Sequence, residues 1–328
     1  MLKSKLRTLS FTLMLTVGLT AAPAAILQPS VIAFAAESSV TTATISEILK
    51  NQKLDGGWQK NYAETSGEWA ASTIDNGATY TEIRKLAAEY SKTKNSAYST
   101  AVIKGINFLV NMQYSNGGWP QVYKSSGYHS HITYNDDAMV NVMILLDEVA
   151  NKKGDFSFIQ DNTLIAKSKA SVNNGVRCLL DSQYKNKSGN LTVWGQQHNE
   201  NTLLPDGARA YELPSLCAKE SANIVKFLKT RPSDARITAS IKAAEAWFES
   251  AKIKDTVVEK IKDSSGKVTD VVVKTKVGAS PIWARFYDLN TNKPIFVDRD
   301  GVPRANLSEI GVERRTGYLW YGAWGSSL

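Results

Sequence analysis

The residue in this sequence with the most distinctive setting for chemistry is an arginine. Arg209 stands close to Tyr211 and Glu212 in a polar segment whose pattern predicts the start of a helix. The chain has only three histidines and two cysteines, so the side chains that most often transfer protons are scarce. Arg209 is therefore a candidate for acid–base chemistry or for binding an anion, and a salt bridge to Glu212 is the structural alternative.

Two further polar clusters precede segments with helical periodicity. The first consists of Asp75 and Asn76, and the second of Asn135, Asp136 and Asp137. Taken separately, Asp75 and Asp137 are explained equally well as helix N-caps or as site residues. Three polar clusters at equivalent points of a repeat favour a shared site.

The repeat consists of a glutamine, a turn and a tryptophan. Its copies are Gln52–Trp58 and Gln113–Trp119, each with Gly-Gly before the tryptophan, and a looser Gln183–Trp194. After each tryptophan a loop leads to a polar cluster and then to another helix. This pattern predicts stacked helical hairpins with the polar clusters at one end, and it predicts packed structural roles for the tryptophans.

The spacing of apolar residues predicts the elements that must position these clusters. Helices are expected over 77–92, 97–113 and 232–252, from Asp137 to about Leu146, and from near Pro214 to Leu228. Alternation over 254–278 predicts a β-hairpin. The charged and aromatic loops that follow are expected to close one wall of a cleft. The predicted fold class is all-α, with a small C-terminal hairpin and loop region.

The first 35 residues differ from the rest of the chain. Lys3, Lys5 and Arg7 precede an apolar run from Leu9 to Leu19, which is typical of a secretory signal peptide and shorter than the ~20 residues of a membrane span. We therefore predict a signal peptide at 1–35, a single domain at 36–328, and a soluble, secreted, extracellular protein. A signal anchor is the alternative.

Charge and cysteine content bound the partners. The net charge of +8 falls to about +5 without the signal peptide, because that segment carries three basic and no acidic residues. The lysines are scattered, which argues against nucleic acid, and an acidic polysaccharide fits at least as well. Cys178 and Cys217 are interpreted either as buried small hydrophobic residues or as a disulfide pair.

Several motifs together resemble the family 10 polysaccharide lyases, which are secreted pectate lyases. The resemblance extends from about residue 44 to 324, with the motifs in the same order. The hairpin at 254–278 is the one departure. The motifs are Asp55–Trp58, Thr73–Thr79, Asn116–Gln121, Tyr134–Met139, Pro205–Glu212, Asp298–Gly301 and Arg314–Tyr318.

This resemblance implies an (α/α)3 partly open toroid that cleaves polygalacturonate by calcium-assisted β-elimination to 4,5-unsaturated oligogalacturonides. It implies Arg209 as the base, and Asp75, Asp137 and Asn76 as the calcium site. An arginine base requires a lowered pKa or high pH. A monomer is expected, with neither a nucleic acid nor a membrane as partner. The implied substrate-binding residues are Arg299, Arg314, Arg315, Asn135, Asp136 and Tyr211.

Other functions remain alternatives on the sequence alone. An α/α-toroid glycoside hydrolase would use Asp75 and Asp137 as its acid and base and would split the bond with water. A non-catalytic pectin-binding protein would keep the tryptophans and arginines without turnover. The glutamine and Gly-Gly-Trp turns also resemble those of terpene cyclases, against which the predicted export and the missing Asp-Asp-x-x-Asp cluster argue.

Overall fold

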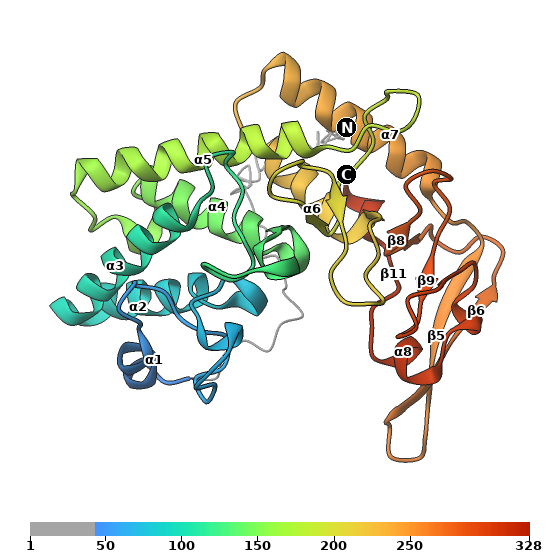
Figure 1. The fold of residues 1–328 in the computed structure, drawn as a ribbon, viewed down its shortest axis with the longest axis horizontal. Helices are drawn as coiled ribbons and strands as arrows, with labels where there is room; N and C mark the ends of the chain where they lie inside the picture. The colour runs from blue at the N-terminus through green and yellow to red at the C-terminus, as the bar shows by residue number, and fades with distance from the viewer. Residues whose placement is uncertain (1–42) are drawn as a thin grey trace, which may run out of the picture. The chain divides into compact units, whose positions relative to one another are not determined.

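The computed structural model describes residues 43–328, so the predicted signal peptide lies outside the described residues. Three helical hairpins make up most of the structure (Figure 1). The helices are α1 (Ile45–Asn51), α2 (Tyr80–Thr93), α3 (Ser96–Met112), α4 (Ala138–Ala150), α5 (Asn162–Ser182), α6 (Ala218–Lys229) and α7 (Ala235–Ala251).

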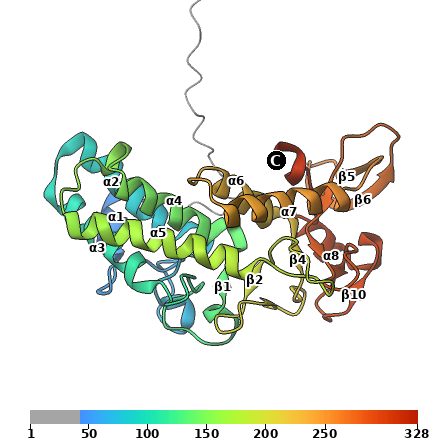
Figure 2. The same cartoon turned by 90° about the horizontal axis from the view of Figure 1, so that it is seen from above.

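The hairpins pair α2 with α3, α4 with α5, and α6 with α7, and α1 packs on α2. Contacts between hairpins join α2, α4 and α6 in one layer and α3, α5 and α7 in a second (Figure 1, Figure 2). The middle helix α4 is apolar on nearly all sides because it is enclosed by both neighbours. The predicted helical hairpins are thus confirmed.

Polar residues start the outer helices where the sequence provides them. Thr44 and Glu47 form a capping box at α1, and Asn95, Asp161 and Asp234 cap α3, α5 and α7. The predicted start of the helix that ends near Leu228 is wrong by several residues, since α6 begins at Ala218 and not near Pro214. No helix in residues 43–328 is long and apolar enough to span a membrane.

The tryptophan turns join successive hairpins by the same hydrogen bonds. Trp58, Trp119 and Trp194 are fully buried, and each indole N–H donates to a carbonyl of the preceding helix at 2.7–2.8 Å. Beside them, the amides of Gln52, Gln113 and Gln183 each reach a carbonyl of the next hairpin. The structural interpretation of the tryptophans is confirmed.

The structure adds a fourth turn that the sequence did not reveal. The indole of Trp283 donates to Phe248 O of α7 at 2.9 Å, and 35 residues separate the pair, against 10 for Trp58 and its partner. The hairpin at 254–278 occupies the difference. We number the units after their tryptophans, so that the first to fourth units contain Trp58, Trp119, Trp194 and Trp283.

Glycine is required in the short turns by close approach of the next helix. Gly56 has φ +104° and Gly117 φ +93°. A Cβ at Gly56 would lie 2.5 Å from Lys104 O of α3, and one at Gly117 only 2.1 Å from Asn174 O of α5. A side chain at either position would push the units apart.

Small sheets make the all-α prediction only partly right. A three-stranded antiparallel sheet links the loops of the second and third units, through β1 (Ile132–Thr133), β2 (Gln197–His198) and β3 (Pro205–Asp206). The predicted hairpin is present as β5 (Thr256–Lys262) and β6 (Val268–Thr275). The remaining antiparallel pairs are β4 (Leu216–Cys217) with β8 (Phe286–Tyr287), β7 (Trp283–Ala284) with β11 (Tyr321–Gly322), and β9 (Phe296–Val297) with β10 (Pro303–Arg304).

The pairs β4–β8 and β7–β11 join segments far apart in the sequence, whereas β5–β6 and β9–β10 join neighbouring ones. In each pair, backbone groups outside the helices satisfy one another. A short helix, α8 (Val312–Thr316), follows near the C-terminus. The (α/α)3 toroid remains a prediction. Cys178 and Cys217 are free and buried, so burial is the correct interpretation for both.

Candidate active site

A polar cleft of about 300 Å³ lies where the loops of the first three units meet. It contains five of the residues that the sequence suggests for a site, namely Asp75, Asn76, Asn135, Asp136 and Arg209. It also contains residues that the motif analysis missed, because their loops show no periodicity and come together only in three dimensions. These are Lys60, Trp69, Tyr128 and Gln197; the cleft also contains Gln121 and Glu212, which belong to motifs named in the sequence analysis.

A tight turn directs Asp75 into the cleft. Asp75–Gly77 form a 3₁₀ turn in which Asn76 has φ +47°, a left-handed conformation that asparagine tolerates. The carboxylate is buried and serves three donors rather than a helix cap. Its Oδ2 accepts from Lys60 Nζ at 2.7 Å and Asn76 Nδ2 at 3.0 Å, and its Oδ1 accepts from Gln121 Nε2 at 2.9 Å.

The second unit repeats this turn with its residues exchanged. Asn135 takes the place of Asp75 and accepts from Gln196, as Asp75 accepts from Gln121. Asp136, with φ +51°, lines the cleft. Asp137 is also left-handed, with φ +59°, and its side chain does not line the cleft.

Asp137 therefore differs from its predicted place. It is buried at the N-cap position of α4, and its Oδ1 accepts from Asn223 of α6 at 2.9 Å. Burial, reinforced by the charge of Glu220, raises the pKa of Asp137 to about 6. Asp136 is the carboxylate that faces the cleft from this unit, and burial raises its pKa although Lys219 opposes the shift.

The third unit presents a different helix start. Cys217 N–H bonds to Trp194 O as Thr73 N–H bonds to Trp58 O. Trp58 N–H donates to the hydroxyl of Thr79, which lies six residues after Thr73. Trp194 N–H donates in the same way to the hydroxyl of Ser221, but Ser221 lies only four residues after Cys217. The third start is two residues shorter, so the chain enters α6 directly.

Lys219 and Glu220 fill this shorter start and form a buried ion network. Arg285 Nη2 donates to Glu220 Oε1 at 2.9 Å, and Lys219 Nζ lies 3.7 Å from the same oxygen and 3.6 Å from Asp136 Oδ1. Burial raises the pKa of Glu220, but the charges of Arg285 and Lys219 outweigh burial, so the net shift is downward.

Arg209 consequently stands in a crossing loop and not at the start of a helix. Its Nε and Nη2 donate to the buried carboxylate of Glu212 at 2.7 and 2.5 Å, and Tyr318 Oη donates to Glu212 Oε1 at 3.1 Å. The Arg209 side chain is 49% exposed. Burial lowers the pKa of Arg209, but the hydrogen bonds and charge of Glu212 outweigh it and raise the pKa above its ordinary value.

Three arginines converge on the ring of Tyr211. The guanidinium carbons of Arg314, Arg209 and Arg299 lie 4.3, 4.9 and 5.8 Å from its centroid. Arg314 is buried, and its Nε has no acceptor within the described residues. Arg299 is exposed and pairs with Glu313 at 2.9 Å. The structure thus brings together four of the residues predicted to act on substrate.

Arg315 does not belong to this cluster. Its Nε and Nη2 donate to Asp270 of the hairpin at 2.8 and 2.9 Å, and it lines a different cavity. Consecutive positions of the short helix α8 point their side chains in different directions. Of the two adjacent arginines, only Arg314 contacts Tyr211.

Comparison with known proteins agrees with this geometry. Residues 44–328 match the sequence profile of the family described as pectic acid lyase. The chain belongs to the pectic acid lyase family. A solved structure of a family 10 polysaccharide lyase from Cellvibrio cellulosa is 39% identical to this lyase, with a TM-score of 0.77, and covers 88% of this chain and 91% of that chain.

An aspartate-to-alanine variant of the Cellvibrio cellulosa enzyme, in complex with trigalacturonic acid, is 38% identical with the same coverage and TM-score. Lanosterol synthase from Saccharomyces cerevisiae is 31% identical over 116 residues, which make up 33% of this chain and 14% of that protein. The chain therefore spans about one seventh of that curated relative's length.

The cleft of this lyase offers oxygen ligands for a hard cation. No group of three or more histidine, cysteine, aspartate or glutamate side chains in residues 43–328 forms a complete metal site. The cleft does hold the carboxylates of Asp75 and Asp136. The buried Oε1 atoms of Gln121 and Gln197 also lack a donor within the described residues. Such an oxygen set fits calcium only if substrate completes the shell.

Proposed function

We propose that this lyase cleaves polygalacturonate by calcium-assisted β-elimination and releases 4,5-unsaturated oligogalacturonides. What supports the proposal is a family match over 44–328 together with a relative of 38% identity bound to trigalacturonic acid. The cleft places cationic side chains beside two carboxylates, as a polyanionic substrate and a bridging cation require. We also propose that the protein is exported and acts as a monomer.

The reaction removes the C5 proton of a galacturonate unit that carries an ionised carboxylate. The electrons of the C5–H bond form the C4–C5 double bond, the C4–O bond breaks, and the leaving oxygen takes a proton from water. Negative charge builds on the carboxylate side, so neighbouring cations stabilise the transition state. When bound by Asp75, Asn76 and Asp136, calcium would neutralise the carboxylate of the substrate.

In this proposal Asp137 supports the turn that carries Asp136 and does not bind calcium itself. Its bond to Asn223 of α6 fixes the left-handed turn that carries Asp136. Lys60 neutralises part of the charge of Asp75, and Lys219 does the same for Asp136. Because both carboxylates are partly neutralised, we expect them to bind calcium mainly when oxygen atoms of the substrate complete its coordination shell.

Arg209 is the proposed base, and its pair with Glu212 leads us to expect a requirement for high pH. A neutral guanidine is required to accept the C5 proton, but Glu212 favours the charged form. Arg314 and Arg299, on the same tyrosine ring, oppose that charge. Turnover should therefore rise into alkaline pH.

The deciding experiment incubates the purified protein with polygalacturonate and calcium at alkaline pH and follows ultraviolet absorbance of unsaturated uronides. β-Elimination requires absorbance to rise in step with the number of chain ends. New reducing ends without absorbance would indicate a glycoside hydrolase, and neither signal would indicate a binding protein. Excess chelator should abolish turnover, and calcium but not magnesium should restore it. Full activity in chelator would remove calcium from the proposal.

A further inference from the structure

The hairpin β5–β6 is an expanded version of the short tryptophan turns. In the first two units, Lys53 N–H bonds to Gly57 O at 3.0 Å and Tyr114 N–H bonds to Gly118 O at 2.8 Å, which closes each turn. In the fourth unit, Ile253 and Ile282 exchange the corresponding bonds at 2.8 and 3.0 Å. Everything between these two isoleucines is added to the turn.

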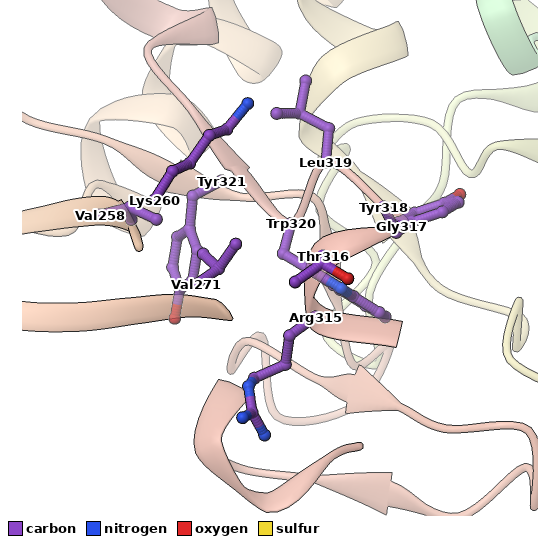
Figure 3. A pocket seen from close by; sticks show the side chains of 10 residues that line it. All are labelled: Val258, Lys260, Val271, Arg315, Thr316, Gly317, Tyr318, Leu319, Trp320 and Tyr321. Carbon is purple, nitrogen blue, oxygen red and sulfur yellow. The ribbon is translucent and has the colours of Figure 1, made fainter. Parts of the chain in front are cut away.

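Three residues of the added hairpin, Val258, Lys260 and Val271, line a second, open cavity of about 220 Å³ together with the C-terminal segment. Figure 3 shows Lys260, Tyr321 and Val271 on one side of it and Thr316 and Trp320 across from them. This volume is below the roughly 300–1,000 Å³ of sites for drug-sized ligands, which leaves space for about one sugar ring.

Most lysines of this hairpin form no ion pair within the described residues. Residues 254–278 contain six lysines and four acidic residues. Each acidic side chain already has a partner: Asp255 accepts from Gly278 N–H, Glu259 pairs with Lys274, Asp263 accepts from Ser265, and Asp270 pairs with Arg315. Of the six lysines, only Lys274 reaches a carboxylate within the described residues.

Lys260 is therefore the cation of this cavity that is available to a ligand. Arg315 also lines it, but its Nε and Nη2 donate to Asp270 and its Nη1 to Ile310 O. Lys260 is exposed on the β5 face that also carries Val258, because alternate strand residues share a face. Burial raises the pKa of Tyr321 to about 12, so its hydroxyl remains a hydrogen-bond donor.

We propose that this cavity is an accessory binding site for one galacturonate unit of the polymer, outside the catalytic cleft. Lys260 would pair with the sugar carboxylate, and the Tyr321 hydroxyl would donate a hydrogen bond. Thr316 Oγ1, which donates to Val312 O, would accept one, and the half-buried rings of Tyr318 and Tyr321 would pack on the apolar face of the sugar. The choice of galacturonate rests on the proposed function. The combination of one free cation, hydroxyls and aromatic rings is what distinguishes an acidic sugar from a simple anion.

The site is adjacent to the cleft but separate from it. Tyr318 lines the second cavity, while its hydroxyl donates to Glu212 of the cleft at 3.1 Å. The segment that carries Tyr318 is thus a wall shared by both. A polymer bound in the cavity would be retained next to the cleft, so the site should matter for long chains and not for a trimer.

The test is affinity electrophoresis of the full chain in gels that contain polygalacturonate and a chelator. Lys260→Ala should weaken retention roughly three- to tenfold, the range for one partly exposed charged contact. Lys267→Ala is the matched control. Lys267 follows Gly266 at the tip of the hairpin and does not line the cavity, so this substitution removes the same charge at a distance from the proposed site. Lys260→Arg should restore most of the retention.

Kinetics provide the second readout. Lys260→Ala should raise KM on polygalacturonate by a similar factor and leave kcat/KM on trigalacturonate unchanged. Equal loss of retention in Lys260→Ala and Lys267→Ala, or none in either, would overturn the accessory site. Equal retention in gels that contain dextran sulfate would replace an acidic-sugar site by a general anion site, which also overturns it. A wild-type protein that is retained but releases no unsaturated product would instead refute the proposed function.

Discussion

The helix starts of the first two units and of the third unit occupy equivalent places but differ in what they present. Asp75 and Asp136 project from left-handed turns into the cleft. The third start is two residues shorter, and its Lys219 and Glu220 are buried with Arg285. One position of a repeat thus supplies polar groups to a site in two copies and a buried ion network in the other.

This difference explains how the third unit still contributes to the cleft. Because its helix start is filled by its own ion pairs, its contribution comes from the crossing loop, where Arg209 and Glu212 lie. The network is not isolated, since Arg285 Nη2 also reaches Asn135 Oδ1 at 3.4 Å. Arg285 of the fourth unit and Lys219 of the third unit, which lies 3.6 Å from Asp136 Oδ1, therefore both support the turn of the second unit.

The largest effect is expected where the loop of the third unit meets substrate. Arg209→Lys keeps the charge but changes reach and geometry, so turnover should fall by roughly 10²–10⁴-fold, as for loss of a general base. Substrate binding and thermal stability should change little. Steady-state kinetics on polygalacturonate measure turnover and KM, and thermal unfolding measures stability. Near-normal turnover would assign the base to another residue.

A companion variant separates a base from a clamp. Glu212→Gln removes the carboxylate that raises the pKa of Arg209, so the alkaline rise in kcat should move to lower pH. If Arg209 only holds the substrate, the position of the rise should stay the same while KM increases. The pH profile of kcat is the measurement.

Substitutions in the buried ion network of Lys219, Glu220 and Arg285 should have the next largest effect, on the free energy of unfolding. Arg285→Met leaves Glu220 buried without its closest cation and should lower the free energy of unfolding by about 3–5 kcal/mol. Adding Glu220→Gln should recover part of the loss, because the unpaired charge is then removed. Denaturant unfolding provides the comparison, and identical losses in single and double variants would contradict a charge effect.

A buried glutamate in the first unit tests the opposite case. Glu82 in α2 is 1% exposed, and burial raises its pKa to about 7, with Tyr62 and Lys85 only partly opposing the shift. The folded state therefore holds this proton more tightly than the unfolded state, whose ordinary pKa is 4.5. Stability from this group is complete below pH 4.5 and is lost as pH rises through 7.

Glu82→Gln should thus stabilise the protein progressively as pH rises, by up to about 3 kcal/mol above pH 7. Denaturant unfolding at pH 5 and pH 8.5 measures the change, and Glu220→Gln is the control because the pKa of Glu220 is lowered. A stability difference that does not depend on pH would show that Glu82 ionises with the same pKa in the folded and unfolded states.

The smallest effects are expected at the amides that join the units. Gln183→Ala leaves Thr192 O and Ser240 O without their buried donor and should cost about 1–3 kcal/mol. Gln52→Ala removes the equivalent bonds in a half-buried position and should cost less, because water can replace them. Equal costs, measured by thermal unfolding, would mean that burial does not distinguish the two joints.

Some elements could be predicted because their causes are local. The helices over 80–93 and 96–112 follow from apolar periodicity and a capping asparagine, and the hairpin follows from alternation around Gly266. The start of α6 could not be predicted, because Pro214 is a local helix signal whereas the actual start is set by the bond from Cys217 to Trp194.

By itself, the sequence determined the tryptophan turns, the helical units and the residues from which a site is drawn. Glycine conformation, indole packing and apolar periodicity depend on near neighbours and are repeated along the chain. Only the tertiary structure decided that Asp136 and not Asp137 faces the cleft, and that Arg314 and not Arg315 reaches Tyr211. In each pair, adjacent side chains diverge, and the outcome depends on partners far along the chain: Asn223 for Asp137 and Asp270 for Arg315.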